Sequence, residues 1–256
     1  MNMKEMNMKE SIELTKQGVE DSFRTGVFYN KQTQDKTHLQ QIMNSLEIRP
    51  GMRILDLGTG MGFLAFPIAE TNPDAIIVGL DIVETALICN RQKAQEEQLD
   101  NLSFVSYDGV HFPFEDGSFD LVITRYALHH FPDIQDTFAE IARVLKEQGQ
   151  FFLSDPTPNR EDTDGFVDAY MQMKKDGHIK FYTCHEWQQL GSAVGLLYQS
   201  DFETDIRFPK KRETAVGFEE ILTKYKREVI DGYHLEVTED EIWITERVNN
   251  ITFRKK

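Results

Sequence analysis

The residues best suited to bind a ligand lie in one short stretch, DLGTGMG, from Asp56 to Gly62 of the 256-residue chain. Gly58, Gly60 and Gly62 alternate there with other residues, and the first of them lies two positions after the carboxylate of Asp56. Glycine lacks a Cβ atom and adopts positive φ readily, so this backbone can approach a ligand closely. The carboxylate favours a cationic group and repels a pyrophosphate. The stretch therefore predicts a ligand site that attracts positive charge.

Asp81 is a second candidate, because it ends an apolar run, residues 75–81, that is typical of a buried strand. A carboxylate at the carboxyl end of the strand beside the glycine turn can accept hydrogen bonds from both hydroxyls of a ribose. In the alternative interpretation, Asp81 is the N-cap of a helix expected over residues 84–98. Both interpretations stay open at this point.

Two adjacent histidines, His129 and His130, follow the fourth apolar strand. Either ring could accept a proton during catalysis, and His178, His185 and Asp155 are further candidates for this role. Consecutive residues that enter a helix point in different directions, so we expect at most one of the pair to face a pocket. Hydrogen bonding to the backbone or stabilisation of a helix end is the more common role of such residues.

A repeating pattern of strands and helices must position these candidates. Apolar strands alternate with helical segments at residues 54–57, 75–81, 101–108, 121–124 and 149–155. This order predicts βαβ units and a parallel sheet covered by helices. Towards the C-terminus, residues 242–254 are rich in strand-forming residues, with a turn expected at Asn249-Asn250.

The pattern Asp56-x-Gly58-x-Gly60-x-Gly62 resembles the first motif of the class I S-adenosylmethionine-dependent methyltransferases. The segments HFPFEDGSFD, FDLVITRYALHHF and GQFFLSD look like the branch of that family that includes the menaquinone and ubiquinone biosynthesis methyltransferases. The resemblance covers about residues 34–155. It implies an α/β, Rossmann-like, doubly wound fold with a mostly parallel seven-stranded sheet, an antiparallel C-terminal strand and helical cap insertions.

The same resemblance implies S-adenosyl-L-methionine as the cofactor and transfer of its methyl group to a small organic molecule. The glycines would then pass the amino-acid moiety, Asp81 would hold the ribose, and Asp108 would accept from the adenine amino group. The cofactor-binding residues implied are Asp56, Gly58, Thr59, Gly60, Gly62, Asp81, Ile82, Asp108, Gly109, Thr124 and Arg125. His129 and His130 are the candidate catalytic residues.

Two other classes of function stay as alternatives. One is an S-adenosylmethionine-binding protein without transferase activity, such as a sensor or a partner subunit. The other is an NAD-dependent oxidoreductase, which Phe63 disfavours because the dinucleotide motif G-x-G-x-x-G requires glycine at that position. The residues Thr124 to Ala127 also lack the Asn/Asp-Pro-Pro-aromatic loop of enzymes that methylate amino groups of DNA bases.

Composition restricts the partners and the location of the protein. The formal net charge of −15 argues against nucleic acid as a partner, because nucleic-acid binding normally relies on a cationic surface. The two cysteines, Cys89 and Cys184, have no metal-ligand spacing, so no metal site is predicted. The sequence has no membrane-length apolar run and no secretory signal, which indicates a cytoplasmic protein. A homodimer is left open.

The chain is expected to form a single domain over residues 1–256. Residues 1–30 would be an N-terminal lid or extension, beginning with a polar segment that is frayed or loosely helical, and Phe28 and Tyr29 could cover a cofactor or dock the segment onto the core. Residues 34–155 would form the cofactor-binding core. Residues 156–182 and 209–235 are candidates for cap insertions over the acceptor.

Overall fold

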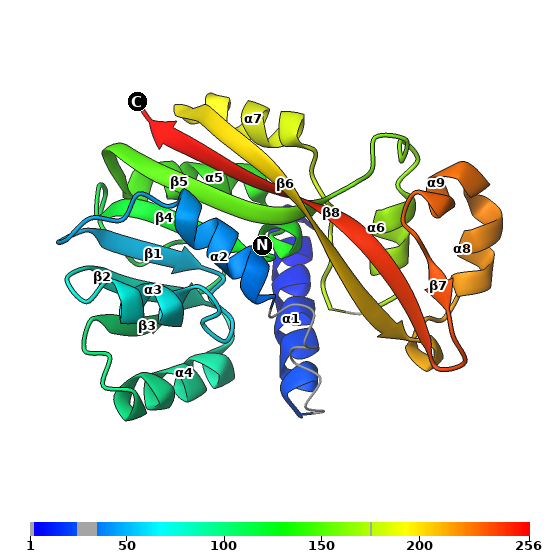
Figure 1. Ribbon diagram of the computed structural model, residues 1–256, viewed down its shortest axis with the longest axis horizontal. Helices are drawn as coiled ribbons and strands as arrows, with labels where there is room; N and C mark the ends of the chain where they lie inside the picture. Colours follow the sequence, from blue (N-terminus) through cyan, green and yellow to red (C-terminus); the bar gives the residue numbers. More distant parts are fainter. Residues whose placement is uncertain (1–2, 25–34, 175) are drawn as a thin grey trace.

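The computed structural model describes residues 3–24, 35–174 and 176–256, which form a twisted sheet with helices on both faces (Figure 1). The strand order is β3-β2-β1-β4-β5-β8-β6, and a two-residue strand, β7, pairs with β8. The strands are β1 (Arg53–Leu57), β2 (Ile76–Asp81), β3 (Leu102–Ser106), β4 (Phe119–Arg125), β5 (Leu145–Thr157), β6 (Leu196–Lys211), β7 (Glu236–Val237) and β8 (Glu241–Lys255). The Rossmann-like α/β class predicted from the sequence is confirmed, and β7 is an addition to the seven strands expected.

The parallel part of the sheet contains β3, β2, β1, β4 and β5. In central β1, every residue after Arg53 is buried, because helices cover both faces of the sheet. The register places Leu57 beside Leu80 of β2 and beside Thr124 of β4. The carboxyl ends of these three strands therefore meet at one edge, which is where ligands bind in open α/β folds.

Two groups of helices complete the core. The first apolar cluster contains residues of α2 (Lys36–Ser45), α3 (Ala65–Thr71) and α4 (Glu84–Glu96), and the second contains residues of α5 (Ile134–Val144) and α7 (Cys184–Ala193). Phe138 of α5 stacks on Trp187 of α7 with 5.7 Å between ring centroids. Both side chains are fully buried, so these two helices share one core with the sheet.

A C-terminal lobe extends beyond the parallel strands. β6 and β8 pair antiparallel along most of their lengths, and residues 247–254 of β8 also pair with β5. The far ends of β6 and β8 pack with α6 (Phe166–Met171), α8 (Phe218–Lys224) and α9 (Arg227–Asp231) around a third apolar cluster. Figure 1 shows this lobe at the right, at the end of the two long strands.

The turn predicted at Asn249-Asn250 is wrong, because both residues lie inside β8. They are 2% and 1% exposed. The side chain of Asn250 has buried partners: Oδ1 lies 2.9 Å from Nε2 of His38, and Nδ2 donates to Oγ1 of Thr204 at 3.1 Å. These long-range hydrogen bonds satisfy an amide that local preference would place in an exposed turn.

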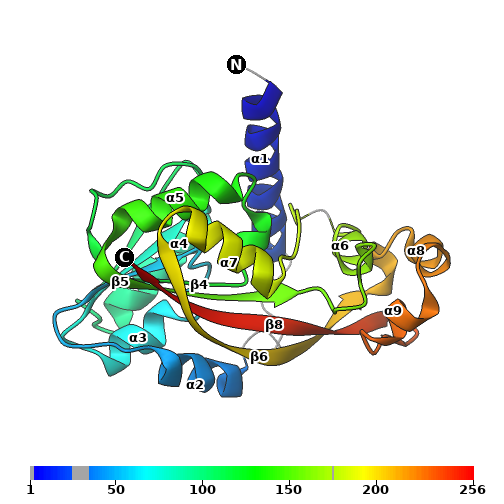
Figure 2. The same ribbon diagram turned by 90° about the horizontal axis from the view of Figure 1, so that it is seen from above.

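The N-terminal segment forms a regular helix, α1 (Met3–Arg24), where frayed or loosely helical structure was expected. The N-terminal end of α1 stands clear of the rest of the molecule (Figure 2), while its middle packs over the carboxyl edge of the sheet. Phe28 and Tyr29 lie outside the described residues. None of the helices in the described parts of the chain is long and apolar enough to cross a lipid bilayer.

Candidate functional site

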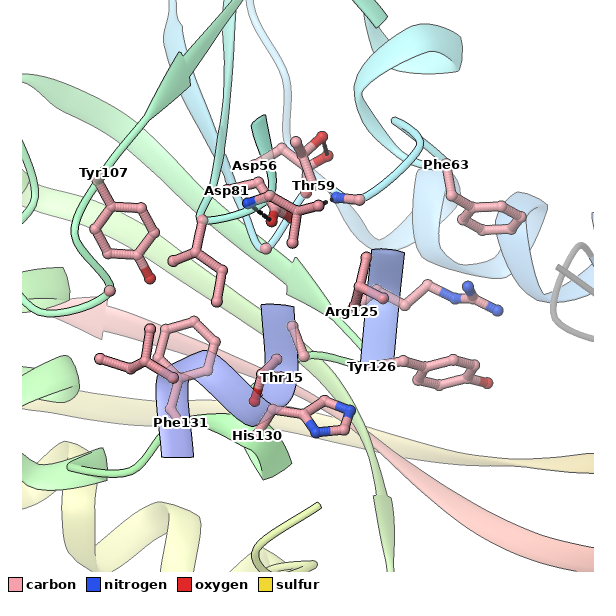
Figure 3. A pocket seen from close by; sticks show the side chains of 18 of the residues that line it. Thr15, Asp56, Thr59, Phe63, Asp81, Tyr107, Arg125, Tyr126, His130 and Phe131 are labelled. Atoms are coloured by element: carbon pink, nitrogen blue, oxygen red, sulfur yellow. Dashed lines mark hydrogen bonds between the residues drawn. The ribbon is translucent and has the colours of Figure 1, made fainter. Parts of the chain in front are cut away.

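A cavity of about 270 Å³ lies at the carboxyl edge of β1, β2 and β4, against α1 (Figure 3). Five segments form its walls: α1, the glycine turn after β1, the end of β2, the loop after β3 and the segment after β4. Most of the elements that carry the candidate residues therefore converge on this one space.

The glycine turn contributes backbone to the wall. Gly58 has φ +67°, and a Cβ atom added there would lie 2.5 Å from the side chain of Ala127. The N–H groups of Gly58 and Thr59 donate to the carbonyl of Leu80 at 2.8 and 3.1 Å, which anchors the turn to β2. Gly58, Thr59 and Gly60 all line the cavity. A ligand can thus lie directly against the main chain, as the spacing of the glycines predicts.

Two buried carboxyl groups, Asp56 and Asp81, line the same cavity. Asp56 accepts from Oγ1 of Thr59 at 2.7 Å, and burial raises the pKa of Asp56 to about 7. Asp81 accepts from the N–H groups of Gly60 at 2.8 Å and Val83 at 2.9 Å, and burial raises its pKa as well. The N-cap of α4 is Val83, so the N-cap interpretation of Asp81 is wrong. Desolvated carboxylates of this kind favour a positively charged ligand.

Arg125 is held between two aromatic rings on the cavity wall. Its Cζ lies 3.9 Å from the ring centroids of both Phe63 and Tyr126. Nη2 of Arg125 lies 3.4 Å from Nδ1 of His38, and the hydroxyl of Tyr126 lies 3.2 Å from the same nitrogen. Tyr126 has φ +53°, which is uncommon for a residue with a Cβ atom. Stacking fixes the guanidinium plane, and a guanidinium fixed in this way suits a carboxylate.

The two adjacent histidines have different surroundings. His129 is buried, and its ring contacts Asp155 with 2.6 Å between Nδ1 and Oδ1. His130 lines the cavity, whereas His129 is not among the residues that do so. Burial lowers the pKa of each ring to about 3, so both are neutral near pH 7. Of the pair, His130 is therefore the one that faces the pocket.

The other candidate bases lie away from the cavity wall. Nε2 of His178 lies 2.9 Å from Oδ1 of Asp168 in α6. His185 is exposed on α7, and its Nε2 lies 3.0 Å from Nε2 of Gln189. Within the described ranges, no group of three His, Cys, Asp or Glu side chains is arranged to hold a metal ion.

Three of the residues proposed for cofactor binding do not line the cavity, whereas their neighbours do. Gly62 and buried Thr124 are not among the residues that line the cavity. Asp108 has a side chain that is 60% exposed, and its Oδ1 accepts from the backbone N–H groups two and three residues later, both at 2.8 Å. Ile82 and Gly109, which flank the predicted ribose and adenine positions, are part of the wall.

The sequence predicted a lid or extension over residues 1–30 but did not identify which residues of α1 line the cavity. Ile12, Thr15 and Val19 line the cavity, and a Cβ atom added to Gly109 would lie 2.9 Å from Cδ1 of Ile12. The spacing of these three residues, i, i+3 and i+7, marks one face of a helix and could have identified them. The polar residues between them obscure this signal. Tyr107, at the end of the cavity near β3, was also missed.

The sheet order, the glycine turn and the acidic strand ends define a Rossmann-like site for a ligand that carries positive charge. A family model described as a methyltransferase domain matches residues 48–201, which is more than half of the chain. The chain therefore belongs to the methyltransferase-domain family. This is the S-adenosylmethionine-dependent class that the sequence motifs predict, with S-adenosylmethionine as its cofactor.

Individual relatives support the assignment. The chain is 33% identical over 159 residues to the uncharacterized methyltransferase YcgJ of Bacillus subtilis, covering 62% of this chain and 62% of YcgJ. The crystal structure of YcgJ matches with a TM-score of 0.75 at 26% identity, over 87% of this chain and 99% of that one. A putative methyltransferase from Bacillus halodurans shares the fold, with a TM-score of 0.76 at 21% identity over 86% and 99% of the two chains.

A third relative has a more specific name. The ubiquinone/menaquinone biosynthesis C-methyltransferase UbiE of Dinoroseobacter shibae is 35% identical over 113 residues, which is 44% of this chain and 45% of UbiE. The sequence matches to YcgJ and UbiE thus span less than two thirds of the length of these curated relatives.

Proposed function

We propose that the protein transfers the sulfonium methyl group of S-adenosylmethionine to a small organic molecule. The presence of Asp56, Asp81 and Arg125 in one cavity carries this proposal. The cofactor has two cationic groups, a sulfonium and an ammonium, and one carboxylate. Two acidic groups and one guanidinium provide the complementary charges. The main chain at Gly58, where a Cβ atom does not fit, allows the close approach that the cofactor requires.

Each group would have a separate role in holding the cofactor. Asp56 would attract the ammonium and Arg125 the carboxylate. Asp81 would accept from the ribose hydroxyls, and the N–H groups of Gly60 and Val83 already orient its carboxylate. Asp108 stays our candidate for the adenine amino group. Gly62, Ile82, Gly109 and Thr124 complete the proposed set.

S-adenosylmethionine, when bound, supplies a methyl group that the sulfonium has already activated for in-line displacement. The residues of the chain therefore act by positioning and by excluding water. The apolar side chains of Ile12, Val19 and Phe131 line the cavity and would keep water from the reacting groups.

The acceptor proposed is a small, neutral or cationic organic molecule, since a net charge of −15 would repel anions. The name of the Dinoroseobacter shibae relative supports an acceptor of this size class. We also propose a single domain in which residues 1–30 act as a lid, and α1 supports this because three of its residues line the cavity. We also propose that residues 156–182 and 209–235 form caps over the acceptor. The proposal further includes a cytoplasmic location and a homodimer.

Calorimetric titration with S-adenosylmethionine, S-adenosylhomocysteine and NAD tests the cofactor. We expect both adenosyl sulfur compounds to bind and NAD not to bind. Asp81→Asn and Asp81→Ala should weaken binding of both compounds at least tenfold, because the ribose loses a carboxyl acceptor and the N–H of Gly60 loses its carboxyl partner. Asp74→Ala is the matched control, since Asp74 is exposed at the opposite end of β2. Binding of NAD alone, or unchanged affinity in the Asp81 variants, would contradict the assignment.

Methyl transfer itself requires a second assay, with S-adenosylmethionine labelled in the methyl group and a panel of small acceptors. Label in an acceptor identifies the enzyme activity. Cofactor binding without transfer to any acceptor would instead favour the sensor or partner subunit.

A further inference from the structure

We propose that His38, a residue of α2 that lies outside the cavity, sets the direction in which Arg125 points and so makes the site selective for ligands that carry a carboxylate. This inference rests on the proposed function, in which Arg125 binds the carboxylate of the cofactor. His38 is 3% exposed and is not among the residues that line the cavity. It is therefore a positioning residue, which acts through its contacts with Arg125 and Tyr126 on the cavity wall.

The two rings that enclose the guanidinium of Arg125 fix its plane but not its rotation within that plane. Figure 3 shows this group between Phe63 and Tyr126, and Cζ lies 3.9 Å from each ring centroid. A bidentate contact with a carboxylate requires two N–H groups to point in one direction, which flat ring faces do not impose. An acceptor at the edge of the guanidinium supplies this constraint. Nδ1 of His38 lies 3.4 Å from Nη2 and is such an acceptor.

The neighbours of the imidazole determine which of its nitrogens can accept. Nε2 of His38 lies 2.9 Å from Oδ1 of Asn250 and 3.4 Å from Oγ of Ser154. The amide of Asn250 is oriented by its Nδ2, which donates to the carbonyl of Phe202 at 3.3 Å and to Oγ1 of Thr204 at 3.1 Å. Because Oδ1 of Asn250 can only accept, the proton of the imidazole lies on Nε2 and the lone pair on Nδ1.

The ring of His38 is neutral at pH 7. Burial lowers its pKa from 6.5, and the charge of Arg125 lowers this pKa further, whereas the hydrogen bond to Asn250 and the charge of Asp35 act in the opposite direction. The bare Nδ1 therefore faces two donors, Nη2 of Arg125 and the hydroxyl of Tyr126 at 3.2 Å. One nitrogen thus orients both the guanidinium and one of the two rings that stack on it.

The C-terminal strands hold His38 in turn. Asn250 lies in β8 and Thr204 in β6, so a chain of buried side chains runs from these strands through α2 to the cavity wall. A ligand with a carboxylate meets a guanidinium that is already ordered, which reduces the entropy cost of binding. A ligand without a carboxylate gains nothing from this order.

Two compounds that differ in the amino-acid part test the inference. S-adenosylhomocysteine carries an ammonium and a carboxylate, and 5′-methylthioadenosine carries neither. Calorimetry gives the ratio of their dissociation constants, in which general damage to the fold cancels. We expect His38→Gln to lower the preference for S-adenosylhomocysteine about fivefold or more, because its amide can donate to Asn250 but leaves no acceptor at the position of Nδ1. His38→Asn should keep the preference within about twofold, because its Oδ1 takes the position of Nδ1.

A double variant separates positioning from a purely structural role. If His38 acts through Arg125, adding His38→Gln to Arg125→Lys leaves the ratio of the single Arg125→Lys variant unchanged. An independent structural effect would multiply the two losses. His185→Gln is the matched control, since His185 is exposed on α7, and it should keep the wild-type ratio.

Nitrogen NMR of the wild-type protein with labelled histidine gives a readout that needs no variant to fold. The ring of His38, identified by its contact with the amide of Asn250, should carry its proton on Nε2. S-adenosylhomocysteine should shift its Nδ1 resonance, and 5′-methylthioadenosine should not. A wild-type ratio in His38→Gln, the same further loss in the double variant as in the single one, or a proton on Nδ1 overturns the inference. Failure of S-adenosylhomocysteine to bind the wild-type protein would overturn the proposed function itself.

Discussion

Asp155 contacts His129 twice, through Oδ2 with the backbone N–H at 3.1 Å and through Oδ1 with Nδ1 of the ring at 2.6 Å. One carboxyl group thus fixes both the main chain and the side chain of the residue that precedes His130. Both partners are buried, with exposed fractions of 1% and 7%. Loss of this carboxyl would leave the backbone N–H and the ring Nδ1 of His129 buried without a hydrogen-bond partner.

We therefore expect Asp155→Ala to lower the free energy of unfolding by about 2–4 kcal/mol. Asp155→Asn should cost less, because an amide can keep one of the two contacts. Asp205→Ala on β6 removes an exposed carboxylate and serves as the control. Urea unfolding followed by circular dichroism measures the difference. Equal midpoints for Asp155→Ala and the control would show that the double contact contributes no stability.

The raised pKa of Asp56, about 7, predicts a pH dependence of cofactor binding. Folding raises this pKa above its unfolded value of 3.8, so the free protein loses the associated stability as the pH rises from about 4 to about 7, where the buried carboxyl ionises. A cationic ligand prefers the ionised form. The affinity for S-adenosylmethionine should therefore increase about tenfold between pH 6 and pH 8, in line with the ionised fraction. Calorimetry at the two pH values checks this, and Asp56→Asn should remove most of the dependence.

The stacked guanidinium of Arg125 predicts discrimination between two ligands. Arg125→Lys should lower the affinity for S-adenosylmethionine at least tenfold, because lysine cannot form a planar bidentate contact with the carboxylate of the cofactor. The same variant should bind 5′-methylthioadenosine, which lacks the amino-acid part, as the wild type does. Arg53→Lys is a matched control, since Arg53 also lies over an aromatic ring, that of Phe119, at the opposite end of β1. If the variant lost the same affinity for both ligands, Arg125 would not be the residue that binds the carboxylate.

The contact between Gly109 and Ile12 predicts a way to loosen α1. Gly109→Ala would place a Cβ atom 2.9 Å from Cδ1 of Ile12, in a backbone with φ +90°. Gly165→Ala has similar backbone strain, about 1–2 kcal/mol, but meets no atom within 4 Å, so it separates strain from collision. We expect trypsin to cleave at exposed Lys9 several times faster in Gly109→Ala than in Gly165→Ala.

Shortening the colliding side chain provides a rescue. Ile12→Val removes the Cδ1 atom that an alanine at position 109 would meet, and in the double variant it should restore part of the protection from trypsin. Equal cleavage rates in the two alanine variants would mean that α1 does not depend on this contact.

The cofactor half of the site could be predicted because its signals are local. Glycines at alternate positions and an acid at the end of an apolar run are properties of a few consecutive residues. Their positions follow from the parallel sheet, which places Asp56 and Asp81 on neighbouring strands. Selecting His130 over His129 required the structure, since the choice depends on Asp155, which is remote in sequence.

The remaining parts depend on contacts between residues that are remote from one another in sequence. Ile12 faces the cavity only because α1 packs beside Gly109. Asn250 lies within a strand because His38 and Thr204 provide its hydrogen-bond partners. The residues around Ile12 and the pair Asn249-Asn250 are mostly polar, so local sequence predicts that both segments are exposed.

The order of the strands also determines the order in which the chain can fold during synthesis. β6 has no contact with β5 in the sheet, since β8 lies between them and pairs with both. β6 is therefore synthesised before β8, the strand with which it pairs. The backbone of β6 can form its sheet hydrogen bonds only after about 30 more residues have been translated. The nascent chain would carry an unpaired strand edge during that interval, which is a natural point of contact for a chaperone.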